Sequence, residues 1–73
     1  MSPQQVKELI LAKFEEKDVE VDGEGAKFHV TIKSDQFKGL MPVKRQQLVY
    51  GCLTQQIASG EVHAVTMSLS THS

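Results

Sequence analysis

Three histidines are the residues of this 73-residue chain best suited to bind a metal ion or to move a proton near neutral pH. His63 follows a turn at Gly60 and opens an apolar run, so we expect it at a strand end that a partner can reach. An imidazole there suits a soft metal, although a purely structural strand-end histidine is the commoner case. His29 lies on the polar side of an alternating run, where an exposed strand residue is the ordinary interpretation, and His72 lies in a polar tail that we expect to fray.

Cys52, the only cysteine, lies beside the apolar ridge of an expected helix. A buried, unreactive thiol is the ordinary case there, because reactivity needs exposure and positive neighbours. One cysteine excludes an internal disulfide, which fits a reducing compartment. One cysteine and scattered histidines also cannot complete a closed four-ligand site, so a metal centre would need ligands from a second molecule.

Charge is distributed unevenly along the chain, although the formal net charge is only −1. Residues 1–24 carry seven acidic residues against three lysines, and residues 25–45 carry five basic residues against one acid. Lys38, Lys44 and Arg45 gather around an expected helix start, where they can meet phosphate or an acidic protein surface. Ordinary solvated charge is the alternative, and no interleaved aromatic residues indicate a platform for single-stranded nucleic acid.

No arrangement of residues indicates an enzyme. Serine and threonine occur without a motif that would activate them, and the acidic residues of the N-terminal third fit a solvated surface. Gly23-Glu24-Gly25 lacks the strand–helix context of a dinucleotide site and is interpreted as a turn between two strands. We therefore expect a binding protein.

The first elements that must position these residues are a helix and a β-hairpin. Ser2, Pro3 and Gln5 form a capping-box start, and the helix should end near Lys17. Its apolar stripe consists of Val6, Leu9, Ile10 and Phe14. Alternating runs then predict a strand over 18–22, a turn over 23–25 and a second strand over 26–33.

A loop and a long helix follow the hairpin. Residues 34–41 should form a structured loop or a single helical turn, with Pro42 as the first helical residue. Met41 then occupies the cap, although its side chain offers no hydrogen-bond acceptor. Gly60 is a natural stop, and Gly51 marks either close packing or a break into two helices.

The alternating pattern over residues 62–69 predicts the last strand. Simple alternation places His63 on the same side as Val65 and Met67, and Val62 on the other side. A helical crossover before this strand favours parallel pairing with the second strand. The pattern as a whole predicts one α+β domain over 1–73, a three-stranded mixed sheet with all helices on one face.

Neither a signal peptide nor a membrane span is predicted. The N-terminus lacks a basic start and an apolar core, and no apolar run approaches about 20 residues. We expect a soluble cytoplasmic protein without a membrane partner, a monomer or weak homodimer when alone.

Two motifs, F-x-G-L-x-P-V-K-R-Q-Q-L-V-Y over Phe37–Tyr50 and V-H-A-V over Val62–Val65, resemble the BolA family. The V-x-V-x-G-E-G run over Val19–Gly25 fits the same family, and the acid-stress branch called IbaG or YrbA is the most similar. The resemblance implies an α-β-β-α-α-β fold similar to the class II KH fold. It does not extend to KH-type RNA binding, because no GxxG loop lies between helices.

The resemblance also implies a function. It implies a non-enzymatic adaptor that pairs with a monothiol glutaredoxin in iron–sulfur cluster trafficking or in the response to iron or acid stress. Members of the family can share a [2Fe-2S] cluster, for which the glutaredoxin supplies cysteine with glutathione, and His63 is the matching ligand here. Other members are DNA-binding transcriptional regulators, the alternative function for this chain, and Lys38, Lys44 and Arg45 would contact either partner.

The chain departs from the family pattern at the second ligand. The family carries a cysteine or histidine in the hairpin loop, whereas residues 25–28 contain neither. His29 is the nearest substitute. Alternation places His29 and His63 on opposite faces, so a shared site requires a bulge or twist at the strand end.

Overall fold

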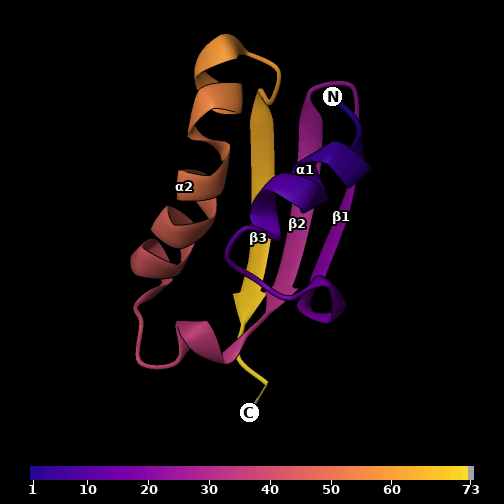
Figure 1. Ribbon diagram of the computed structural model, residues 1–73. Helices are drawn as coiled ribbons and strands as arrows, with labels where there is room; N and C mark the ends of the chain where they lie inside the picture. The colour runs from indigo at the N-terminus through magenta and orange to yellow at the C-terminus, as the bar shows by residue number, and fades with distance from the viewer. Residues whose placement is uncertain (73) are drawn as a thin grey trace.

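The computed structural model describes residues 1–72 as an α+β fold, with two helices on one face of a mixed sheet and the other face open (Figure 1). The sheet order is β1-β2-β3; β1 and β2 are antiparallel, and β2 and β3 are parallel as predicted. The elements are α1 (Pro3–Ile10), η1 (Glu16–Asp18), β1 (Val19–Glu24), β2 (Lys27–Lys33), η2 (Asp35–Phe37), α2 (Pro42–Ser59) and β3 (Ala64–Ser70), where η1 and η2 are single 3-10 turns.

Helix α1 begins as predicted and ends earlier than predicted. The hydroxyl of Ser2 accepts from the Gln5 amide at 3.2 Å, and the Gln5 side chain accepts from the Ser2 amide at 2.8 Å, which completes the capping box. The helix stops at Ile10 instead of near Lys17. The turn that follows it carries Phe14, which packs on Phe37 with ring centroids 5.4 Å apart.

The hairpin turn begins two residues later than the glycine pattern indicated. Strand β1 continues through Glu24, which pairs with Lys27, so Gly25 and Ala26 alone form the loop. Gly25 has φ of +60°, as required at the first position of a type II′ hairpin turn. Gly23 is a strand residue, and a Cβ there would lie 2.2 Å from the Lys27 carbonyl oxygen.

The connection between β2 and β3 consists of η2 and α2, so the first of the two helices in the family topology is a single turn here. Ser34 caps η2 by accepting from the Gln36 amide, a cap that the sequence analysis did not predict. Met41 gives α2 no side-chain cap, as expected. Helix α2 runs unbroken through Gly51, so the predicted break is wrong. Gly51 marks no tight packing either, because a Cβ there would approach only the Lys13 ammonium, at 3.8 Å.

The core lies between the sheet and both helices and is mainly aliphatic. Its buried members are Val6, Ile10, Phe14, Val19, Phe28, Val30, Ile32, Phe37, Val49, Leu53 and Val62. Within residues 1–72, no helix has the length and apolar character required to cross a membrane.

Candidate functional site

A kink at the start of β3 determines the direction of His63. The amides of His63 and Ala64 both donate to the carbonyl of Ala26, at 2.8 and 3.1 Å. Alternation therefore slips by one residue: Val62 is 1% exposed, His63 and Ala64 are both exposed, and Val65 is half-buried. The predicted parity of Val62 and His63 is wrong, because two successive amides share one acceptor.

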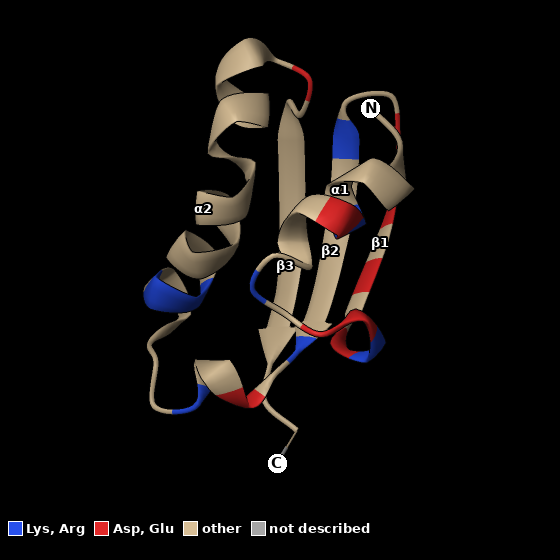
Figure 2. Ribbon diagram, in the orientation of Figure 1, with Lys and Arg blue, Asp and Glu red and all other residues tan. Residues whose placement is uncertain are grey.

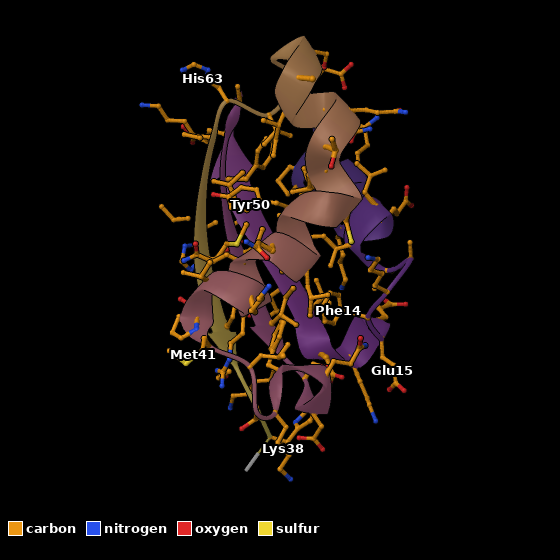
Figure 3. The ribbon with its side chains drawn as sticks, turned by 90° about the vertical axis from the view of Figure 1, so that its left-hand side faces the viewer. Phe14, Glu15, Lys38, Met41, Tyr50 and His63 are labelled. Carbon is orange, nitrogen blue, oxygen red and sulfur yellow. The ribbon has the colours of Figure 1, made fainter. Side chains whose placement is uncertain are left out.

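The His63 ring extends from the end of the sheet, away from both helices (Figure 3). Its position before the first residue of β3 agrees with the predicted exposed strand end. No side chain of residues 1–72 hydrogen-bonds to this ring in the structure. His63 therefore offers an accessible ring nitrogen that can bind a metal ion.

His29 lies on the open face of the sheet, as alternation predicted, and both of its ring nitrogens contact hydroxyl groups. Nδ1 lies 2.6 Å from Thr66 Oγ1, and Nε2 lies 3.4 Å from Ser68 Oγ. Thr66 is its register partner on β3 and follows His63 by three residues, about 10 Å along a strand. The outward direction of His63 removes the predicted opposition of faces, while the contacts with Thr66 and Ser68 engage both ring nitrogens of His29.

A metal site within this chain alone is not formed by the described residues 1–72. They contain no group of three or more histidine, cysteine or carboxylate side chains that could hold a metal ion.

The third histidine is fixed rather than frayed. The His72 amide lies 3.3 Å from Asp35 Oδ1, and its Nε2 lies 3.1 Å from Asp18 Oδ1. The expected frayed tail is therefore wrong up to His72. Nothing in the local sequence signals these contacts, because Asp18 and Asp35 are distant in the chain.

The three basic candidates differ in their surroundings. Lys38 and Lys44 are exposed, on the loop before α2 and in the first turn of α2, where Figure 2 shows blue segments. Arg45 is half-buried: its Nε donates to the Leu40 carbonyl at 3.0 Å and its Nη1 to the Leu69 carbonyl at 3.3 Å. The guanidinium also lies 5.9 Å from the Phe37 ring centroid. Arg45 thus ties the loop before α2 to the end of β3.

Cys52 has the surroundings of a structural thiol. It is half-buried, and its Sγ lies 3.7 Å from the Leu48 carbonyl within α2. Burial raises the pKa of the Cys52 thiol, and the positive charge of Lys13 partly opposes that rise. A thiol with a raised pKa holds little thiolate near neutral pH, as the helix pattern predicted.

Fold and sequence both match one family of known proteins. The family model described as BolA-like protein matches residues 9–73. The chain belongs to the BolA family. A BolA domain from SufE1 of Arabidopsis thaliana superposes with a TM-score of 0.82 at 28% identity, covering 96% of this chain and 91% of that one.

Relatives of similar length match nearly the whole chain. An uncharacterized protein from the rpoN-murA intergenic region of Acinetobacter guillouiae is 46% identical over 71 residues, which cover 97% of this chain and 86% of the relative. The acid stress protein IbaG of Escherichia coli K12 is 32% identical over 71 residues, covering 97% and 84%. The resemblance to the acid-stress branch is therefore confirmed at the level of sequence.

The donor set of this BolA-like chain suits a cluster shared with another protein. His63 supplies one accessible imidazole, while His29 is held by hydroxyl groups and Cys52 is half-buried. A surface that presents a single metal-ligating side chain can complete the coordination of an iron–sulfur centre whose remaining ligands come from a partner.

Proposed function

We propose that this chain is a cytoplasmic, non-enzymatic adaptor that pairs with a monothiol glutaredoxin in iron–sulfur cluster trafficking or in the response to iron or acid stress. His63 would ligate a [2Fe-2S] cluster whose other ligands are thiolates of the glutaredoxin and of glutathione. Membership of the BolA family, with an acid stress protein among its relatives, supports this proposal.

One observation carries the proposal: His63 is exposed at the start of β3, where its amide and that of Ala64 share the carbonyl of Ala26. Simple alternation placed His63 on the side of Val65 and Met67, which pack against the core. The exposed ring lies instead at the end of the sheet and points away from the helices (Figure 3).

The basic residues lie too far from His63 to form a single small site with it. Lys38 lies near the N-terminal end of α2 and His63 near its C-terminal end (Figure 3). Eighteen helical residues span about 27 Å. A partner that ligates with His63 must therefore extend along α2 to reach Lys38 or Lys44.

The test mixes this chain with a monothiol glutaredoxin that carries glutathione and a [2Fe-2S] cluster. Visible absorption and circular dichroism should change on mixing, and His63→Ala should remove the change that reports histidine ligation. His29→Ala serves as the matched control and should retain it. If His63→Ala reproduces the wild-type spectrum, the ligand assignment is wrong; if the proteins do not associate, the adaptor proposal fails.

DNA binding is the second candidate function, supported by the two exposed lysines beside the start of α2. It predicts an affinity that falls steeply with salt and with Lys38→Gln or Lys44→Gln. The measurement is retention of duplex fragments at 25 to 200 mM salt. Absence of retention at the lowest salt would eliminate this candidate.

A further inference from the structure

Exposed apolar side chains form a line along one flank of α2. Val43, Tyr50 and Ile57 are 62%, 39% and 38% exposed. They are seven residues apart, so they repeat after two turns and lie on one side of the helix. We call these three residues the α2 stripe. The core side of the helix is a different one, carried by Val49 and Leu53.

The stripe lies on the flank of α2 that borders β3. Gln46, which is next to the stripe on a helical projection, lines a hollow with Met67 and Leu69 of β3. Figure 3 shows Tyr50 on this flank, on the same side of the molecule as Met41 and His63. Met41, just before the helix, is 72% exposed and extends the apolar surface.

The outward side of α2 carries no charge beyond its first turn. From Gln46 to Gly60 the sequence contains no acidic or basic residue. A helix on the surface of a globular protein normally carries charged residues on its solvent face. An uncharged helix with an exposed heptad line therefore has the character of a helix-packing surface.

The stripe is symmetric about Tyr50. When two copies of α2 pack antiparallel, Tyr50 faces Tyr50 of the partner and Val43 faces Ile57 of the partner, so the same residues serve both sides. Antiparallel packing also sets Lys38 and Lys44, at one end, against Glu61, at the other. Parallel packing would instead bring the lysines of both copies together. Charge and spacing thus select one arrangement.

We propose that a second copy of this chain docks on the α2 stripe in an antiparallel, two-fold symmetric dimer. One helix face about 27 Å long and about 10 Å wide buries on the order of 300 Å² per copy. Stable interfaces bury roughly 800 Å² per partner, so the dimer is weak and forms with rising protein concentration.

Cysteine cross-linking tests the geometry. In a Cys52→Ser background, Tyr50→Cys should form a disulfide-linked dimer on mild oxidation at millimolar concentration. Val43→Cys alone and Ile57→Cys alone should not, whereas an equal mixture of these two should give the mixed dimer, identified by mass. Cross-linking of Val43→Cys with itself, or no cross-linking of Tyr50→Cys, would overturn the antiparallel pairing.

Sedimentation equilibrium tests the association without glutaredoxin. The apparent mass of the wild type should rise from 8.1 kDa towards twice that value up to 1 mM protein. Tyr50→Glu should abolish the rise, while Gln55→Glu, on another exposed side of α2, should retain it. A wild type that stays at the monomer mass at 1 mM, or equal loss in both variants, would refute the proposal. Circular dichroism of each variant establishes that it is folded.

Discussion

Arg45 shows how a charged residue in a basic cluster can serve the fold. Its two donated hydrogen bonds end on carbonyls of the loop and of β3, and its guanidinium lies near the ring of Phe37. Arg45→Met should lower the free energy of unfolding by about 1–3 kcal/mol, because two carbonyls lose a charged donor. Lys44→Met, on the exposed side, should change it by less than about 0.5 kcal/mol. Urea titration of both variants compares them directly, and equal effects would contradict this role of Arg45.

The Cys52 thiol should make the stability of the fold depend on pH in the alkaline range. Since burial raises the pKa of the folded thiol above that of the unfolded thiol, the folded chain holds this proton more tightly. The contribution to stability is complete below the unfolded pKa and is lost as pH rises through the folded pKa. Cys52→Ser should therefore reduce the loss of stability in the alkaline range, as measured by urea unfolding between pH 7 and 10.5. Identical pH profiles would contradict this assignment.

Within the helices and strands, replacing two glycines by alanine should change the stability of the fold in opposite directions. Gly51 lies exposed inside α2 with only ordinary contact nearby, so Gly51→Ala should stabilise the fold by about 0.5–1 kcal/mol. Gly23 lies in β1, where a Cβ would collide with the backbone of β2, so Gly23→Ala should cost about 1–3 kcal/mol. Thermal unfolding checks both signs, and a stabilised Gly23→Ala would show that β1 can move aside.

Local sequence signals predicted the starts of both helices and the end of α2, but not the end of α1. The capping box at Ser2, the proline at Pro42 and the stop at Gly60 are short-range features, and each is confirmed. Helix α1 ends before Phe14, which packs on Phe37, 23 residues later in the chain. The periodicity of apolar residues in the sequence cannot predict that contact.

The candidate site was predictable in identity and less so in direction. The position of His63 after the Gly60 turn indicated an exposed strand end, as observed. Its face was predicted wrongly because the sharing of the Ala26 carbonyl depends on the hairpin of β1 and β2. The role of Arg45 was likewise hidden, since its acceptors are backbone carbonyls that any sequence would provide.

At the scale of the whole molecule, the two candidate functions occupy opposite ends. Lys38 and Lys44 lie near the start of α2, and His63 lies beside its far end (Figure 3). Lys38→Glu with Lys44→Glu should therefore abolish any retention of DNA and leave the glutaredoxin-dependent spectrum unchanged. His63→Ala should do the reverse. Electrophoretic retention and visible circular dichroism on the same preparations test this separation, and loss of both signals in either variant would contradict it.

The shared carbonyl of Ala26 has a consequence for engineering. Because it accepts from both His63 and Ala64, residue 26 of the hairpin loop is held beside the start of β3. A metal-ligating side chain introduced at this position would lie close to His63, which could serve as the second ligand. Ala26→His should give the isolated chain an affinity for Co²⁺ that the parent lacks, visible as new d–d absorption bands, and the further change His63→Ala should remove them. The hairpin loop and the start of the last strand thus place two positions close enough for an engineered metal site with two protein ligands.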